Sequence, residues 1–377
     1  MTQAPPAPPQ PLVLLAAGGT GGHLFPAEAL AAALNRRGFA VDLATDARAA
    51  RYAGHFPARK LHVLPADTMR GRSPVALAKT AFALGTGFLA GLMLLRKVKP
   101  AVVVGFGGYP TVPPLFAATV LGVPSLVHEA NGVMGRANRL LAPRVSAIAT
   151  GFPGILDRDP VLSAKALWTG NPLRPAVLDA ARIPYVPVSP DGPLNLLVFG
   201  GSQGARVMSD IVPDAIAALD PALRARVHVV QQAREEDLER VRATYARAGV
   251  VAEVAPFFQD LPVRMAAAQL VISRSGASTV AELAALGRPS LLVPLPGALD
   301  QDQAANARSL AERGGALTIL QADFTPARVA QELTRLAATP QELTNMADAA
   351  RSAGVLDAAE RLADLVARLA GGAPIPA

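Results

Sequence analysis

Twice along the chain, a short apolar run leads through a glycine loop into a helical pattern. The first unit runs from Leu12 through the loop 18–22 into an alanine-rich stretch at 26–34, and the second starts at residue 194 and contains the loop 200–204. A buried strand followed by a glycine loop and a helix opens a doubly wound α/β domain. The repeated unit therefore predicts two such domains.

The rest of the chain alternates between strand-like and helix-like stretches. This alternation is typical of a parallel sheet with helices on both faces. At 377 residues the chain is also longer than one hydrophobic core usually organises. The expected strands are 12–17, 40–45, 61–64, 101–104, 124–128 and 145–150 in the first half, and 194–199, 227–231, 250–255, 270–273, 290–293 and 316–319 in the second.

We expect the proline-rich segment 171–192 to be a linker between an N-terminal domain over 11–170 and a C-terminal domain over 193–354. Residues 1–10 are mostly Pro, Ala and Gln and resemble a disordered tail rather than a signal peptide. Two doubly wound domains facing each other would place a ligand cleft at the carboxyl ends of both sheets.

The chain carries a net charge of +7 and contains no cysteine. The lack of cysteine excludes a disulfide framework and thiolate metal sites, and it indicates a reducing compartment. The positive charge indicates an anionic partner, such as a phosphorylated substrate or an anionic lipid surface. We expect no nucleic-acid partner, because aromatic residues are few and no basic run is interleaved with them.

The first glycine loop ends at His23. Its glycines would let backbone N–H groups approach an anion, and the helix N-terminus would add further donors. Leu24 stands where the dinucleotide fingerprint needs a glycine, and no P-loop pattern occurs. A histidine beside bound phosphates could act as a base, while a structural or capping role is the alternative interpretation.

Other polar segments also follow expected strands. In the first half these are 105–109 and 128–131, with a tight turn and a core histidine as the structural alternatives. In the second half, the segment 273–282 opens a helix whose N-terminus could hold a diphosphate, and Glu282 could accept hydrogen bonds from ribose. We interpret the acidic pair at 300 and 302 as capping and first-turn charge, because further metal ligands are missing.

The stretch 74–99 contains a long uncharged segment, Thr80 to Leu95. It is short for a membrane crossing. One interpretation is an apolar crossover helix buried on the sheet, and the other is a patch on the membrane surface; both can hold together. In the second case Leu77, Phe82, Phe88, Leu92 and Leu95 would contact acyl chains, and Lys79, Arg96, Lys97 and Lys99 would meet anionic headgroups.

These motifs together resemble the MurG family of bacterial glycosyltransferases, which add N-acetylglucosamine (GlcNAc) to lipid I. The matching pieces are GGTGGHLFPAEALA, GGYPTVPP, HEANGVMGRANR, TGNPLRP, FGGSQGA, SRSGASTVAELAALGRPSLLVPLP and DQDQAANA, in the family's order over nearly the whole chain. The resemblance implies a GT-B fold of two Rossmann-like domains. It also implies that the final helix, about 355–370, packs back on the first domain.

The resemblance implies a UDP-GlcNAc donor held mainly by the second domain and an undecaprenyl-diphosphate-MurNAc-pentapeptide acceptor. It places the protein peripherally at the cytoplasmic face of the inner membrane, in peptidoglycan synthesis, cell shape and cell division, with partners among the proteins of those processes. Expected donor-binding residues are Thr20, Gly21, Gly22, Asn131, Arg174, Ser202, Phe258, Ala277, Ser278, Thr279, Val280, Ala281, Glu282, Gln303 and Asn306. Expected acceptor-binding residues are Gly19, Gly107, Gly108, Tyr109 and His128.

The resemblance implies that Glu282 contacts the ribose hydroxyls and that Gln303 and Asn306 contact the GlcNAc. It also implies that the backbone of Phe258 contacts the uracil. The sequence departs from the family's pattern at Ala130, where the family commonly has glutamine, and at Thr111, where it usually has serine. The first departure removes a polar contact, and the second keeps the hydroxyl.

We expect an inverting transfer in which the C4 hydroxyl of MurNAc attacks C1 of GlcNAc and UDP leaves. His23 is the first candidate for the base and Glu129 the second. The helix 277–286 and the loop 200–204 would stabilise the leaving UDP without a cofactor or a tightly bound metal. Three alternatives stay open: a transferase with a diacylglycerol acceptor, a UDP-GlcNAc 2-epimerase, and a non-catalytic nucleotide-sugar sensor at the membrane.

Overall fold

The computed structural model describes residues 10–18, 21–52, 54, 56–65, 74–189, 191–201, 204–298 and 301–373, without the side chains of 21, 51, 52 and 74–81. Within these ranges the chain forms two compact units, each built on its own parallel sheet. The first unit holds the residues up to 130, then 134–172 and those from 357 onward, and the second holds 131–133 and 173–356.

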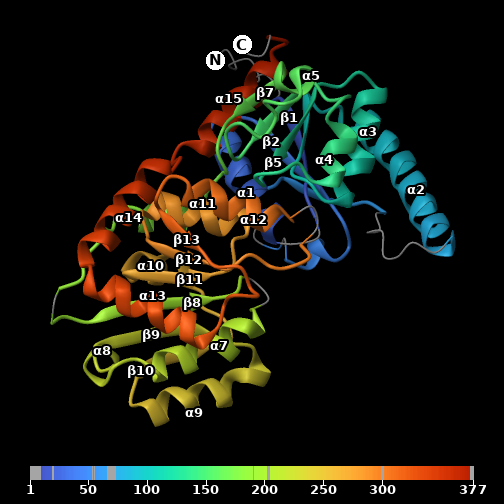
Figure 1. The fold of residues 1–377 in the computed structure, drawn as a ribbon. Coiled ribbons are helices and arrows are strands. Elements are labelled where there is room, and N and C mark those ends of the chain that lie inside the picture. Colours follow the sequence, from blue (N-terminus) through green and yellow to red (C-terminus); the bar gives the residue numbers. More distant parts are fainter. Residues whose placement is uncertain are drawn as a thin grey trace, which may run out of the picture. The chain divides into compact units, whose positions relative to one another are not determined.

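The first unit contains a seven-stranded sheet in the order β3-β2-β1-β4-β5-β6-β7 (Figure 1). The chain moves outward from β1 in one direction and then, from β4, in the other. This order creates a switch point between β1 and β4, and such folds bind ligands at the carboxyl ends of the strands there. The strands are β1 (Leu12–Ala16), β2 (Ala40–Thr45), β3 (Lys60–Val63), β4 (Val102–Gly105), β5 (Ser125–Glu129), β6 (Ala147–Thr150) and β7 (Ala166–Trp168).

Helices cover both faces of this sheet, so its central strands are apolar on both sides. Val13 and Leu15 pack on one face with residues of α1 and α15. Leu14 and Ala16 pack on the other face with residues of α2, α3 and α4. The helices are α1 (Gly21–Arg36), α2 (Pro74–Val98), α3 (Val112–Val120), α4 (Arg136–Leu141), α5 (Pro160–Ser163) and α15 (Ala358–Ala370), with the single turns η1 (Ala49–Tyr52) and η2 (Tyr109–Thr111).

The last helix, α15, belongs to the first unit and packs on α1. Leu362 and Val366 of α15 are fully buried in the core that α1 shares. At the surface, Arg37 pairs with Glu360 at 2.6 Å and with Asp364 at 2.5 Å. Apolar burial holds this contact together, because exposed ion pairs add about 1 kcal/mol or less each.

The second unit contains a six-stranded sheet in the order β10-β9-β8-β11-β12-β13, with its switch point between β8 and β11. Its strands are β8 (Leu194–Phe199), β9 (Val227–Gln232), β10 (Val251–Ala255), β11 (Leu270–Ser273), β12 (Ser290–Leu292) and β13 (Ala316–Thr318). Its helices are α6 (Pro175–Ala180), α7 (Arg206–Ala217), α8 (Pro221–Arg224), α9 (Leu238–Ala248), α10 (Leu261–Ala267), α11 (Ala277–Leu286), α12 (Asp302–Ala311), α13 (Pro326–Ala338) and α14 (Pro340–Ala353), with the turn η3 (Glu235–Asp237).

Much of the segment expected as a linker packs on the second unit. It contains α6, and its carbonyls at Ile183 and Pro184 accept hydrogen bonds from Arg288 at 2.9 and 3.2 Å. Arg288 is fully buried and also donates to the carbonyl of Ala266 on α10. Burial lowers the pKa of Arg288 to about 10. Backbone carbonyls therefore stabilise this buried cation and anchor the segment.

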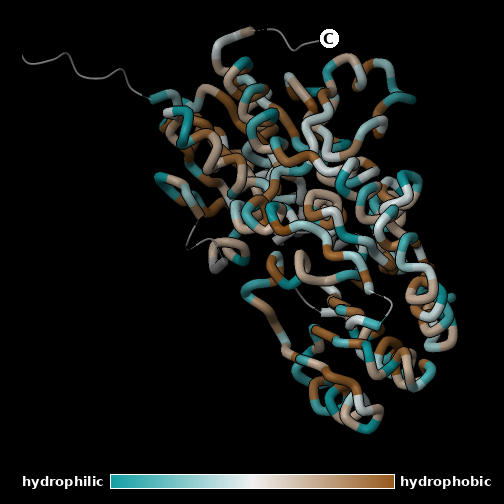
Figure 2. The backbone as a smooth tube through the Cα atoms, turned by 90° about the vertical axis from the view of Figure 1, so that its left-hand side faces the viewer, coloured by the Kyte–Doolittle hydropathy of each residue, from teal (hydrophilic) through white to brown (hydrophobic). Residues whose placement is uncertain are grey.

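The expected α/β class is confirmed, and each strand expected from the sequence is present, with ends that differ from the expected ones by at most two residues. Figure 2 shows the alternation that made this possible: hydrophobic stretches run through the interior of each unit, and most hydrophilic stretches lie at its outside. The edge strand β7 was not expected. It spans only Ala166–Trp168 and is partly exposed, so it lacks a buried apolar run.

Candidate functional site

His23 lies in the first turn of α1, at the switch point of the first sheet. Its Nδ1 lies 3.0 Å from the carbonyl oxygen of Gly18. A carbonyl oxygen only accepts hydrogen bonds, so Nδ1–H is the donor. In the neutral imidazole, the proton-accepting lone pair is therefore on Nε2. If His23 acts as the expected base, it would accept the proton on the nitrogen opposite the one that the Gly18 carbonyl anchors.

The turn after β4 surrounds this imidazole. Gly107 and Gly108 both have positive φ angles, +90° and +78°. A Cβ at Gly107 would lie 3.3 Å from Nε2 of His23, and one at Gly108 would lie 3.4 Å from its Nδ1. Glycine is needed here for its backbone conformation and for the space it leaves to the ring. Two motifs predicted at the same rim are thus in contact.

The hydroxyl of Thr111 holds the same turn closed. Its Oγ1 donates to the carbonyl of Gly108 at 2.8 Å, and its backbone N–H donates to that oxygen at 3.1 Å. Thr111 is fully buried, whereas Tyr109 between them is partly exposed. The hydroxyl at position 111 therefore shapes the turn, and Tyr109 is the residue of this turn whose side chain reaches the surface.

His128 is fully buried at the end of β5. Its Nε2–H donates to the carbonyl of Gly170 at 3.1 Å, and its ring lies 5.6 Å from that of Phe106. Burial lowers the pKa of His128 to about 4. A neutral imidazole without exposed surface favours the core-histidine interpretation over contact with an acceptor.

Glu129 is also buried, with 2% of its surface exposed. Its Oε2 accepts hydrogen bonds from the N–H of Gly135 at 2.9 Å and from Nδ2 of Asn138 at 2.8 Å. These bonds fix the turn that leads into α4. Since the carboxylate is engaged in shaping this turn, the geometry favours His23 as the base.

In the second unit, α11 follows β11 after three residues, at the switch point with β8. Gly276 caps it without a side-chain hydrogen bond. The N–H groups of its first turn, at Ala277, Ser278 and Thr279, therefore have no acceptor within the helix and carry the positive end of its dipole. This arrangement is suited to a diphosphate.

Glu282 lies further along α11, with its side chain 10% exposed. Its Oε1 accepts a hydrogen bond from NH2 of Arg174 at 3.1 Å. Two residues predicted separately as donor ligands are thus paired. Val280 and Ala281 lie between the first turn and Glu282, with Val280 buried.

Asn306 on α12 is fully buried, and its carboxamide is engaged. Its Nδ2 donates to Oδ1 of Asn131 and to the carbonyl of Ser275, both at 3.2 Å. Its Oδ1 accepts from the N–H of Gly132 at 2.7 Å. Both amide hydrogens are used, so these contacts favour a role in holding Asn131 rather than the sugar contact expected from the resemblance.

Gln303 is more exposed to solvent than Asn306. It is half-buried, and its Oε1 accepts from the N–H of Leu295 at 3.1 Å, which orients the amide. The side chain of Phe258 is buried, and the guanidinium of Arg264 lies 4.4 Å from its ring centre. This packing holds the backbone at 258, where the contact to uracil is expected.

Several expected residues lie outside the described part of the chain. These are Gly19, Thr20 and Ser202, and the side chains of Leu77 and Lys79. Gly21 begins α1, and Gly22 beside it is exposed.

Helix α2 has two different faces. Phe88 packs edge-on against Phe116 with ring centres 5.5 Å apart, Leu92 is half-buried, and Leu95 is 2% exposed. Phe82 is 74% exposed. Leu95 therefore belongs to the core and not to a lipid-contacting patch, and Phe88 and Leu92 face the core as well. Arg96 and Lys97 are exposed at the end of the helix.

The exposed face of α2 carries two residues that were not predicted, Leu89 and Met93, which are 59% and 66% exposed. With Phe82 they form what we call the α2 stripe. Their spacing of seven and four residues along a helix was the available signal. Figure 1 shows α2 on the outer side of α3. Within the described residues, no helix combines the length and hydropathy required to span a bilayer.

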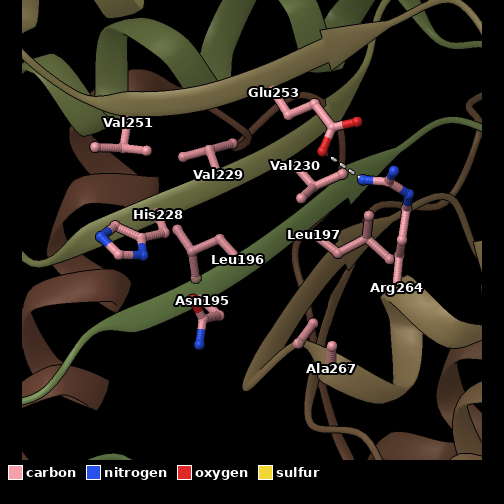
Figure 3. Close-up of a pocket in the computed structure, with 11 residues that line it drawn as sticks. Asn195, Leu196, Leu197, His228, Val229, Val230, Val251, Glu253, Arg264 and Ala267 are labelled. Atoms are coloured by element: carbon pink, nitrogen blue, oxygen red, sulfur yellow. Dashed lines mark hydrogen bonds and ion pairs between the residues drawn. The ribbon is translucent and has the colours of Figure 1, made fainter.

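A groove in the second unit has no predicted site residue in its lining (Figure 3). Its volume is about 400 Å³, and Val230, Val251 and His228 line it, with an ion pair of 2.6 Å between Glu253 and Arg264 at one side. Its lining residues belong to β8, β9, β10 and α10 and to the residue that follows α10, and none belongs to α11. Among the described residues, no three His, Cys, Asp or Glu side chains gather as a metal site would require.

Comparison with known proteins matches both halves of the chain. The N-terminal domain of glycosyltransferase family 28 matches residues 13–150, and the C-terminal domain of that family matches residues 195–362. A relative from Rhodopseudomonas palustris (strain HaA2) is 64% identical over 96% of this chain and 98% of its own length. It is named UDP-N-acetylglucosamine–N-acetylmuramyl-(pentapeptide) pyrophosphoryl-undecaprenol N-acetylglucosamine transferase. The chain belongs to the MurG family of glycosyltransferases.

Further comparisons support this family membership. One from Bradyrhizobium sp. (strain ORS 278), with the same name, is 63% identical over 96% of this chain and 98% of its own length. The crystal structure of Acinetobacter baumannii MurG matches with a TM-score of 0.79 at 30% identity, covering 96% of this chain and 100% of that one. The UDP-GlcNAc 2-epimerase from Neisseria meningitidis shares only the fold, with a TM-score of 0.66 at 14% identity over 95% of this chain and 100% of that one.

Proposed function

We propose that this protein transfers GlcNAc from UDP-GlcNAc to the C4 hydroxyl of MurNAc in undecaprenyl-diphosphate-MurNAc-pentapeptide. The observation that carries the proposal is the 64% identity, over 96% of the chain, to a transferase named for that reaction. The sequence motifs, which resemble those of the MurG family, imply the same reaction.

The second unit supplies the donor subsites in this proposal. The first turn of α11 receives the diphosphate with its N–H groups, and Ser202 with Arg174 adds contacts there. Glu282 accepts hydrogen bonds from the ribose hydroxyls, and Gln303 contacts the GlcNAc. Asn131, held by Asn306, completes the sugar contacts.

The transfer is a single displacement with inversion. The C4 oxygen forms a bond to C1 of GlcNAc, and the bond from C1 to the β-phosphate oxygen breaks, so UDP leaves with the electron pair. Nε2 of His23 takes the hydroxyl proton, because its Nδ1–H is committed to Gly18. The dipole and N–H groups of α11 stabilise the charge that develops on UDP. Gly107, Gly108 and Tyr109 flank the acceptor.

The lipid acceptor requires contact with a membrane, and we propose that the α2 stripe makes it. Phe82, Leu89 and Met93 would enter the interface of the bilayer. Arg96 and Lys97 would meet anionic headgroups, each worth about 1 kcal/mol near such a surface. The proposal includes the cytoplasmic face of the inner membrane as the location, and proteins of cell-wall synthesis and division as partners.

The deciding experiment incubates the protein with radiolabelled UDP-GlcNAc and a lipid I analogue, with and without the acceptor. We expect label to enter the lipid fraction as a disaccharide only when the acceptor is present. Acceptor-independent change of the sugar at C2 would indicate an epimerase, and transfer to diacylglycerol instead would indicate a different acceptor. Donor binding without any turnover would indicate a sensor. Each of these results contradicts the proposal.

A further inference from the structure

Arg174 and Glu282 contact each other, although 108 positions separate them in the sequence. NH2 of Arg174 lies 3.1 Å from Oε1 of Glu282. Arg174 directly precedes α6, and Glu282 lies on α11, which packs on α6. The contact is therefore built into the packing of two helices within the second unit.

The ion pair is largely buried, and burial affects the protonation of Glu282. The side chain of Glu282 is 10% exposed and that of Arg174 is 26% exposed. Burial raises the pKa of Glu282, and the positive charge and hydrogen bond of Arg174 act against that rise. A carboxyl group in this position without its cation would tend to take up a proton.

The pair leaves the carboxylate able to accept more hydrogen bonds. Arg174 uses one nitrogen on one oxygen, whereas an ionised carboxylate has about four acceptor positions. A vicinal diol requires two of them. A protonated carboxyl would offer a donor hydrogen at one oxygen instead, and a carboxylate without Arg174 could rotate away.

We propose that Arg174 is a positioning residue for the ribose. Through its ion pair with Glu282, Arg174 keeps that carboxylate ionised and oriented, so that it can accept hydrogen bonds from both ribose hydroxyls. The inference rests on the proposed function, in which Glu282 contacts the ribose. It gives Arg174 an action that passes through Glu282 and is separate from its own expected contact with the donor.

The test measures how much the ribose hydroxyls contribute to binding. Calorimetry gives the Kd of 2′,3′-dideoxy-UDP divided by that of UDP for the wild type, Arg174→Gln, Glu282→Gln and the double variant. We expect a ratio of roughly ten- to hundredfold in the wild type, as for hydrogen bonds to a charged acceptor. In each single variant it should fall to about threefold or less, and the double variant should fall no further than Glu282→Gln.

Two further variants serve as controls. Arg182→Gln removes a cation of the same segment whose side chain is 85% exposed, and it should keep the wild-type ratio. Arg174→Lys keeps the charge and should restore most of the ratio, even if Arg174→Gln folds poorly. Thermal unfolding followed by circular dichroism checks that each variant is folded.

The inference is overturned if Arg174→Gln weakens the binding of UDP and dideoxy-UDP equally, because Arg174 would then act on a part of the donor other than the ribose hydroxyls. In that case the proposed transferase activity stands. A wild-type ratio near one would overturn both the inference and the ribose role of Glu282. A failure of the radiolabel transfer assay is a separate result, which concerns the enzyme and not this pair.

Discussion

His23 is oriented by its backbone partner and enclosed by a glycine turn. Replacing it with alanine or glutamine removes the proposed proton acceptor and leaves the proposed donor subsites of the second unit in place. We expect kcat to fall by about 10²–10⁴-fold, as for the loss of a general base, with little change in the KM for UDP-GlcNAc. Initial rates at saturating acceptor measure both values.

The matched control for this variant is His228→Gln. The side chain of His228 is exposed and lies in the groove of the second unit, so its loss should leave kcat unchanged. A near-normal kcat for His23→Ala would show that His23 is not the base. Glu129 would then be the remaining candidate.

His128 predicts a dependence of stability on pH. Burial disfavours the charged ring and lowers the pKa of His128 to about 4 in the folded protein, against 6.5 for a solvent-exposed histidine. Below pH 6.5 the unfolded chain takes up a proton that the folded protein does not, so stability falls as the pH decreases toward 4. From pH 7 to pH 5 this one group should cost about 2 kcal/mol.

Urea unfolding of the wild type and of His128→Gln, at pH 7 and pH 5, measures this effect. The wild type should lose about 2 kcal/mol more between the two pH values than the variant loses. Equal losses would show that His128 does not titrate in this window. The variant is expected to be less stable at pH 7, because it changes a fully buried side chain.

At the scale of elements, α2 shows how one apolar helix serves two surroundings. Gly87 and Gly91 let it approach its neighbours closely: a Cβ at Gly87 would lie 2.2 Å from the carbonyl oxygen of Pro65 and 3.1 Å from Cγ of Pro113. At Gly91 it would lie 3.2 Å from the carbonyl oxygen of Pro113. The glycines thus face the core, and the α2 stripe is on the opposite side.

Changing Phe82, Leu89 and Met93 to serine should weaken binding to anionic vesicles at least about tenfold, because each lost apolar side chain removes a favourable transfer term. Sedimentation with vesicles of a zwitterionic and an anionic lipid measures it. Serine at the exposed Val161 and Val251 is the control and should not change binding. Unchanged sedimentation of the triple variant would remove the membrane role from the stripe.

At the scale of the whole molecule, the unit that we propose binds the donor has a helix N-terminus that could stabilise a leaving diphosphate. In the proposed function, the helix dipole and first-turn N–H groups of α11 supply positive charge where UDP would depart. We therefore expect the transfer rate to persist in EDTA, within about threefold of the untreated rate, since these groups are part of the backbone. A loss of more than tenfold that added Mg²⁺ restores would show that a metal performs this task.

Most of the fold could be predicted because the strands of a doubly wound sheet leave clear patterns in the local sequence. Strands buried on both faces need continuous apolar runs, and the chain marks their ends with glycine loops. The strand β7 could not be predicted this way, since an edge strand is held by pairing with its neighbour and needs no apolar run. The segment 171–192, which precedes β8, was expected to be a linker because proline marks breaks in the chain but does not show what a segment packs against.

The sequence by itself determined the two parallel-sheet domains, the glycine turns at their switch points and the family, because these depend on residues close together in the chain. Only the tertiary structure decided which polar groups are already engaged. His128, Glu129 and Asn306 are buried with backbone or amide partners. The physical reason is that the partner of a buried polar group lies far away in sequence, so local patterns do not encode it.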